Sequence, residues 1–252
     1  LVLLYADRSI DLLRPQSGQV VHLPQLKREA SADLAINDLS VSGDEACIAT
    51  SGGVVRIDLK QRLVRGFYQL GACRSATVFD GHIFVALAAG STLVAPLTAN
   101  LNDRAEWQPH TQLPAARLLP TDGALYLLVM RDAPAHHGVW MVLPAAAATD
   151  AYTARHVGAY ALTGGHVDAG GTLIAESDAA LYRYQGADGM PYVIRKDAGG
   201  YAFEPDGTDG LWVGMEGRGL FRTPIVEGRI DLTRATTTYG GFGPRQDRAY
   251  FM

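Results

Sequence analysis

One short pattern returns along the chain at a nearly constant interval, and this repeat constrains the fold more than any other feature of the sequence. In each copy a turn containing glycine is followed by an apolar stretch, a break of small residues and a second apolar stretch, as in DGTDGLWVGMEGRGLFR at residues 206–222. The turn glycines Gly43, Gly81, Gly123, Gly170 and Gly210 lie 38, 42, 47 and 40 residues apart. A period of this length is typical of β-propeller blades, which have four strands each.

Burial gives the physical reason for such a repeat. A single four-stranded sheet leaves both of its faces in water, whereas blades stacked around an axis cover the faces of their neighbours, and each large apolar side chain removed from water contributes roughly 1.5–3 kcal/mol. The sequence therefore predicts an all-β fold, a β-propeller of four-stranded antiparallel blades with about six blade equivalents in this chain. Seven blades in the intact propeller is the alternative. We expect residues 1–252 to be a single propeller domain and a fragment of a longer multidomain protein.

The position of each strand within the repeat can also be predicted. The inner strand of a blade is expected just before the turn, as in INDLSVSG at residues 36–43 and RSATVFDG at residues 74–81. The outer strand is expected at RLVRGFYQL, residues 62–70, and the first unit, residues 1–26, lacks a preceding inner strand. Trp140 and Trp212 are predicted to occupy equivalent strands and to pack between blades.

Composition and charge exclude several classes of protein. The chain is 48% hydrophobic and 19% charged, which is typical of a protein with a sizeable core rather than a disordered one. Its net charge is −4 without a basic cluster, so we expect no nucleic-acid partner. No apolar run reaches the roughly 18 residues that a membrane span needs. Cys47 and Cys73 are not in a CxxC spacing; they are predicted to be small buried residues, with a disulfide between them left open.

No arrangement in the sequence indicates catalysis. The seven histidines are scattered, and the carboxylate pairs fall at predicted blade turns, where aspartate is favoured because it hydrogen-bonds the backbone. We therefore predict a protein that is not an enzyme, with no catalytic residues, no metal ligands and no cofactor.

Longer stretches resemble a known family. The unit at residues 206–222 resembles the two-component regulator propeller repeat of bacterial surface and periplasmic proteins. YADRSIDLL from Tyr5 resembles a strand of PorZ-like proteins of the Bacteroidetes, and INDLSVSGDEACIATSGGVVRIDLK is similar to that family's next blade. GPRQDRAYFM from Gly243 resembles the link into its second propeller. STLVAPLTANLNDRAEW resembles a connector of that family, with Asn100, Leu101, Asp103 and Trp107 in place.

This resemblance implies a cell-surface component of the type IX secretion system that takes part in delivering anionic lipopolysaccharide. It implies an exported protein, located on the extracellular face of the outer membrane or in the periplasm. The partners it implies are other secretion-system proteins or an anionic glycolipid or glycan. This chain would correspond to the first propeller of such a protein.

Binding is expected on one face of the propeller, where the loops that enter the inner strands meet the loops that join the middle strands. The first set of loops would contribute Asn37, Arg74, Arg117 and His166, and the second set Glu176, Asp178, Glu216 and Arg218. We hypothesise that Arg74, Arg117 and Arg218 clamp a carboxylate or phosphate by forked hydrogen bonds.

Two other functions remain open at this stage. The first is the periplasmic sensor propeller of a hybrid two-component receptor, which a membrane span and a kinase or cyclase domain downstream would identify. The second is a propeller lyase or hydrolase, which would need carboxylates or histidines clustered at the axis.

Overall fold

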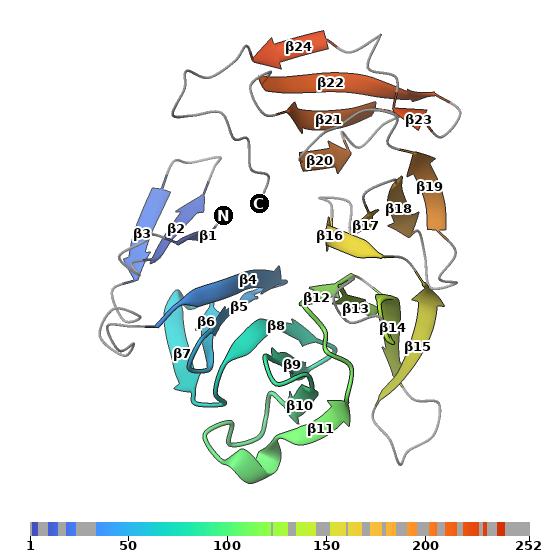
Figure 1. Ribbon diagram of the computed structural model, residues 1–252. Helices are drawn as coiled ribbons and strands as arrows, with labels where there is room; N and C mark the ends of the chain where they lie inside the picture. Colours follow the sequence, from blue (N-terminus) through green and yellow to red (C-terminus); the bar gives the residue numbers. More distant parts are fainter. Residues whose placement is uncertain are drawn as a thin grey trace.

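The computed structural model describes residues 2–4, 10–14, 19–23, 34–121, 123–130, 135–144, 152–159, 161–167, 172–177, 180–184, 191–195, 202–205, 210–215, 219–226, 229–230 and 236–239. These residues form 24 β-strands and one short 3-10 helix, so the predicted all-β class is confirmed. The strands assemble into antiparallel sheets that follow the chain, which we call blades 1 to 6 (Figure 1).

Blades 2, 3 and 4 are four-stranded sheets whose strands pair in chain order. Blade 2 consists of β4 (Ile36–Ser42), β5 (Glu45–Thr50), β6 (Val54–Asp58) and β7 (Leu63–Tyr68). Blade 3 consists of β8 (Cys73–Phe79), β9 (His82–Leu87), β10 (Thr92–Pro96) and β11 (Gln108–Thr111), with the 3-10 helix η1 (Arg104–Glu106) between its last two strands. Blade 4 consists of β12 (Arg117–Pro120), β13 (Leu125–Val129), β14 (Gly138–Pro144) and β15 (Tyr152–Gly158).

The remaining sheets follow the same plan with some differences. Blade 1 has three strands among the described residues, as the sequence predicted: β1 (Val2–Leu4), β2 (Ile10–Arg14) and β3 (Gln19–Leu23). Blade 5 consists of β16 (Leu162–Val167), β17 (Leu173–Ser177), β18 (Ala180–Tyr184) and β19 (Pro191–Arg195). Blade 6 consists of β20 (Ala202–Pro205), β21 (Gly210–Met215), β22 (Gly219–Val226) and β24 (Thr236–Tyr239). The two-residue strand β23 (Arg229–Ile230) pairs with both β22 and β19 and so joins blades 5 and 6 into one sheet.

The repeated pattern corresponds to the second and third strands of a blade. Its copy at residues 206–222 contains β21 and the first half of β22, which pair as an antiparallel hairpin with Met215 opposite Gly219. Two predicted tryptophan positions are not equivalent, however. Trp140 lies on β14, the third strand of blade 4, whereas Trp212 lies on β21, the second strand of blade 6. The prediction was wrong because Trp140 follows the break between the two apolar stretches of its repeat copy, whereas Trp212 precedes that break.

The turn between β8 and β9 is set by local chemistry. Between β8 and β9 the two turn residues Asp80 and Gly81 both have positive φ, 47° and 71°. Positive φ at both central residues is characteristic of the type I′ turn, which matches the right-handed twist of paired strands and favours Asp-Gly. The predicted inner strands before Gly43 and Gly81 are thereby confirmed as β4 and β8.

The blades are arranged with their first strands inward. In Figure 1, β4, β8, β12 and β16 lie toward the middle, while β7, β11, β15 and β19 lie at the outside. The middle strands of blades 2, 3 and 4 are largely buried on both faces, which explains their nearly continuous apolar sequences. On β13, for example, Leu125 and Leu127 face a cluster shared with blade 3, while Tyr126 and Leu128 face a cluster shared with blade 5. Side chains alternate along a strand, so one strand supplies the core on both of its sides.

Candidate functional site

The sequence-predicted site residues fall into three groups. Asn37, Arg74 and Arg117 lie where expected, at the beginning of the inner strands β4, β8 and β12. Glu176 lies near the end of β17, opposite Gly164, and therefore near the same end of its blade. Asp178, Glu216 and Arg218 lie outside the described residues.

His166 is a correction. It was expected in the loop that enters an inner strand, but it lies inside β16, near the end that turns into β17, where it pairs with Ile174. The strand begins at Leu162, earlier than the sequence suggested, because its central pair of glycines reads as a turn although both residues are within the sheet. Gly165 is buried there, and a Cβ on it would lie 2.5 Å from the Leu128 side chain, so this position has no room for a larger residue.

The inner strands carry a polar network that joins several blades. The Asp38 carboxylate on β4 accepts a hydrogen bond from Ser75 Oγ on β8 at 2.5 Å and from Arg117 Nη2 on β12 at 3.2 Å. Ser75 Oγ in turn accepts the backbone N–H of Leu118 at 3.0 Å. Arg117 Nη1 donates to the backbone carbonyl of Gly165 on β16 at 2.9 Å. We call Asp38, Ser75, Arg117 and Gly165 the axial network.

These residues meet because they occupy corresponding positions in the repeat. Asp38 lies four residues before Ser42, Ser75 four before Phe79 and Arg117 four before Thr121. Ser42, Phe79 and Thr121 are the residues that close the turn into the second strand of their blades. In β4 and β8 the register shifts just before this residue, between Ile36 and Asp38 and between Cys73 and Ser75. A β-bulge of this kind re-aims the side chains beside it, so the same bulge in successive blades points polar groups at one another.

Two further contacts link the inner strands β4 and β8. Asn37 Nδ2 donates to the Cys73 carbonyl at 2.6 Å, and Ser40 Oγ and Thr77 Oγ1 lie 2.7 Å apart. The predicted residue Asn37 therefore links blades 2 and 3. Sequence reasoning missed Asp38, Ser75, Ser40 and Thr77. Asp38 lies five residues before Gly43 and Ser75 six residues before Gly81, so alignment on the turn glycines does not match them.

The axial network decides how many hydrogen-bond donors the predicted clamp arginines have left for a ligand. The Arg117 side chain is 40% exposed but two of its nitrogens are engaged, one of them by the Asp38 carboxylate, whose side chain is only 10% exposed. Arg74 has a single long contact, from Nη2 to the Ala88 carbonyl at 3.4 Å. Of the two clamp arginines among the described residues, Arg74 has more donors left than Arg117. The third, Arg218, lies outside the described residues.

A second polar group lies between blades 3 and 4. The Tyr152 hydroxyl is 2.7 Å from His82 Nδ1 and donates to the Asp80 carboxylate at 3.3 Å. Burial, followed by the nearby Asp80 charge, raises the pKa of Tyr152 to about 12. The His110 ring packs edge-on against Phe84, and burial lowers the pKa of this histidine. Tyr152 is the first residue of an outer strand, so this group joins the outer part of blade 4 to blade 3.

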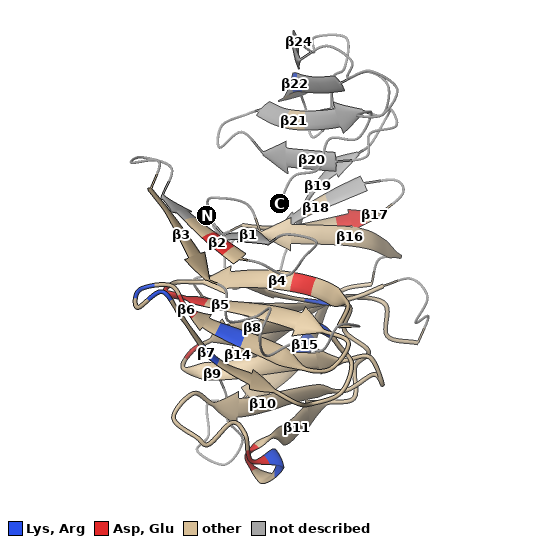
Figure 2. Ribbon diagram, turned by 90° about the vertical axis from the view of Figure 1, so that its left-hand side faces the viewer, with Lys and Arg blue, Asp and Glu red and all other residues tan. Residues whose placement is uncertain are grey.

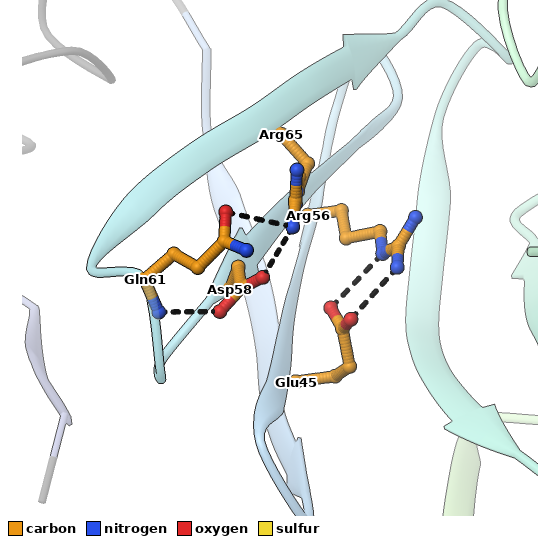
Figure 3. Close-up of polar contacts among 5 residues, drawn as sticks. All are labelled: Glu45, Arg56, Asp58, Gln61 and Arg65. Carbon is orange, nitrogen blue, oxygen red and sulfur yellow. Dashed lines mark hydrogen bonds and ion pairs between the residues drawn. The ribbon is translucent and has the colours of Figure 1, made fainter.

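Charged pairs within blade 2 are structural. Figure 3 shows Arg56 bound to the Glu45 carboxylate by two hydrogen bonds, of 2.9 and 2.7 Å, and Arg65 bridging Asp58 and Gln61. The backbone N–H of Gln61, with Arg65 in addition, lowers the pKa of Asp58. Glu45, whose pair with Asp44 is among the carboxylates predicted at blade turns, is the first residue of β5, and its carboxylate is bound by Arg56. Figure 2 shows acidic and basic residues spread over several strands and turns of the described ribbon rather than gathered on one face.

The connector motif of residues 97–107 forms a compact structure. Asp103 caps η1 by accepting the Ala105 N–H at 2.9 Å, and Trp107 Nε1 donates to the Leu101 carbonyl at 3.0 Å. The Trp107 ring packs against Tyr68 of blade 2, with centroids 6.1 Å apart. The motif residues thus anchor the connector to the neighbouring blade.

Both cysteines are buried and have free thiols. Burial raises the pKa of each thiol to about 12, so neither is a reactive thiolate at neutral pH. Among the described residues, no three histidine, cysteine or acidic side chains are grouped so as to hold a metal ion. The part of the chain that is described also contains no helix with the length and hydropathy to cross a bilayer.

Comparison with known proteins identifies the family that the first blades resemble. Residues 1–108 match the family model of the PorZ N-terminal β-propeller domain. The similarity recognised in the sequence is therefore confirmed over these residues. A search of curated proteins found no significant match.

Solved structures share the fold over nearly the whole chain. PorZ of Porphyromonas gingivalis, a bacterial surface component of the type IX secretion system, superposes with a TM-score of 0.71 at 18% identity over 96% of this chain. The extracellular domain of BT4673 from B. thetaiotaomicron, described as a one component system, has a TM-score of 0.59 at 12% identity over 94% of the chain. AztD from Citrobacter koseri has a TM-score of 0.61 at 12% identity and covers 95% of the chain.

The chain is shorter than each of these proteins. It spans 31% of the PorZ chain, 36% of the BT4673 domain and 73% of AztD. At these identities the likeness shows a common fold, which is that of a PorZ-like β-propeller.

Proposed function

We propose that this protein is a non-enzymatic β-propeller interaction module of an exported or cell-surface type IX secretion component. The observation that carries the proposal is the match of residues 1–108 to the PorZ N-terminal propeller, supported by the structural likeness to PorZ over most of the chain. Other proteins of the secretion system are the proposed partners of the whole protein.

The proposed ligand site is the face where the inner strands begin. Asn37, Arg74 and Arg117 each lie at the beginning of the inner strand in three successive blades, and Glu176 is near the same end of blade 5. The axial network holds this face in one arrangement, which reduces the entropy that a ligand has to remove on binding. Arg74 has donors to offer an anion, because its one contact within the described structure is long. We propose that the ligand is the anionic polysaccharide of a lipopolysaccharide.

Binding of purified anionic lipopolysaccharide, compared with lipopolysaccharide carrying an uncharged polysaccharide, tests this proposal. We expect the anionic form to bind more tightly and Arg74→Gln to weaken it by about tenfold, the effect of losing one charge-assisted hydrogen bond. Lys60→Gln is the matched control, since Lys60 is an exposed cation in the outer β6–β7 turn. Equal affinity for both lipopolysaccharides, or equal effects of the two variants, would refute a site at Arg74.

A sensor propeller is the second candidate function, because the BT4673 extracellular domain has the same fold over 94% of this chain. The flanking gene sequence separates the two. A second propeller with a sorting domain supports the secretion component, whereas a membrane span with a signalling domain supports the sensor. Turnover of an oligosaccharide panel by the purified protein would contradict the non-enzymatic assignment.

A further inference from the structure

A small pocket opens at the outer rim between blades 2 and 3, close to the connector that carries η1 (Figure 1). Its volume is about 180 Å³, and its walls come from the end of β7 with the following loop and from the β10–β11 connector. This volume is about six times the share of one water molecule in the liquid, ≈30 Å³. It is below the range of pockets for drug-sized ligands, ~300–1,000 Å³, so it suits a single ring.

The floor of the pocket is apolar and fixed. Trp107 is buried, with its indole N–H bound to the Leu101 carbonyl, and its ring packs on Tyr68. Phe67 and Leu70, which are half-buried, complete the apolar surface. Because Trp107 is only 5% exposed and its nitrogen is already occupied, the floor shapes the pocket but offers a ligand little surface of its own.

The rim of the pocket carries the polar groups. The side chains of Gln69, Asn102 and Arg104 are exposed, and none of them has a hydrogen-bond or ion-pair partner among the described residues. Their backbone is nevertheless held in place, since the Asn102 N–H donates to Asn100 Oδ1 and Asp103 caps η1. These three side chains have their donors and acceptors available to a ligand, and the backbone that carries two of them is held in place.

The chemistry of the rim selects the ligand. Each carboxamide can donate and accept hydrogen bonds, which matches hydroxyl groups that do both, and the guanidinium adds further donors. The exposed carboxylates of Asp103 and Glu106 lie within two residues of Arg104, so the local charge is not positive overall. An anion gains little there from long-range electrostatics. We propose that the rim pocket binds one uncharged, hexose-sized sugar residue, with its hydroxyls on Gln69, Asn102 and Arg104.

Saturation-transfer NMR and titration of the full chain test this proposal. The probes are methyl glucoside, methyl mannoside and methyl galactoside, with glucuronate and glucose 6-phosphate as the anionic arm. We expect at least one methyl glycoside to bind with a dissociation constant of roughly 1–10 mM, a modest affinity in keeping with so small a contact. Gln69→Ala and Arg104→Ala should each weaken that binding at least about fivefold.

Gln112→Ala is the matched control, because Gln112 is also exposed but does not line the pocket. It should bind the glycoside as the unaltered protein does, and so should Arg74→Gln, which separates this site from the axial face. The absence of saturable binding, or equal binding by Gln69→Ala and Gln112→Ala, would overturn the proposal. Tighter binding of the anionic sugars, abolished by salt, would overturn the choice of an uncharged ligand.

Discussion

The blades are joined in two different ways, by apolar clusters between neighbouring sheets and by the axial network on the inner strands. Each apolar cluster involves two successive blades, as in the cluster that Phe84 of blade 3 shares with Leu118, Leu125 and Leu127 of blade 4. The axial network instead connects β4, β8, β12 and β16, and Arg117 contacts both Asp38 and Gly165. The clusters therefore stabilise pairs of blades, whereas the network fixes the mutual positions of several blades at the face proposed for binding.

The largest expected loss of stability comes from an apolar cluster between blades. Leu127 is fully buried between blades 3 and 4, so Leu127→Ala should lower the free energy of unfolding by about 2–5 kcal/mol, because it leaves a cavity. Urea unfolding followed by circular dichroism measures this loss. Val41→Ala, at a valine that is 49% exposed, is the control and should change little. A loss below about 1 kcal/mol for Leu127→Ala would mean that the blades do not depend on this cluster.

Removal of the Asp38 carboxylate should cause the next largest loss in the free energy of unfolding. Asp38→Ala leaves Ser75 and Arg117 without their acceptor, and hydrogen bonds to charged groups contribute about 1.5–3 kcal/mol. The amide proton of Leu118 should also exchange faster, because Ser75 Oγ, its acceptor, loses its own partner. Asp44→Ala, at an exposed turn residue, serves as the comparison. Unchanged stability and unchanged Leu118 exchange would contradict the role of the network.

The Ser40–Thr77 hydrogen bond should contribute less than the axial network to the free energy of unfolding. Ser40→Ala and Thr77→Val each remove one neutral hydrogen bond, expected at about 0.5–1.5 kcal/mol. The double variant should lose less than the sum of the two single losses, because both act on the same bond. Strictly additive losses in a double-mutant cycle would show that the two hydroxyls do not interact.

The smallest expected effect is a pH dependence between blades 3 and 4. Burial lowers the pKa of His110 below its usual value of 6.5, so the unfolded chain takes up the proton more readily than the folded one. This contribution to stability is complete above about pH 7 and declines as the pH falls through 6.5 toward the folded-state pKa. Thermal unfolding between pH 7.5 and 5 should show the decline, and His110→Phe should reduce it. An identical pH profile for the variant would assign the dependence to other groups.

The repeat made much of the architecture predictable. The Asp-Gly turn at residues 80–81 and the alternating apolar strands around it are local signals, and they led to the correct inner strands β4 and β8. The site could be predicted only in part. Asn37, Arg74 and Arg117 were placed at the correct strand ends, but His166 was not, because its glycine-rich strand lacks the β-propensity that marks the other inner strands.

Other features depended on contacts between distant residues. Asp38 and Ser75 carry no sequence signal for a shared network, since they are 37 residues apart and meet only because a bulge occurs at the same place in both strands. The rim pocket likewise combines the end of β7 with a connector from the next blade.

The sequence by itself determined the blade unit of this protein, because turn chemistry and side-chain alternation act over a few residues. The tertiary structure decided which polar groups meet at the axis, which arginine is already paired and where the rim opens. The physical reason is that these properties depend on the register and angle between blades. Those are set by packing along many side chains at once, and no short stretch of sequence contains them.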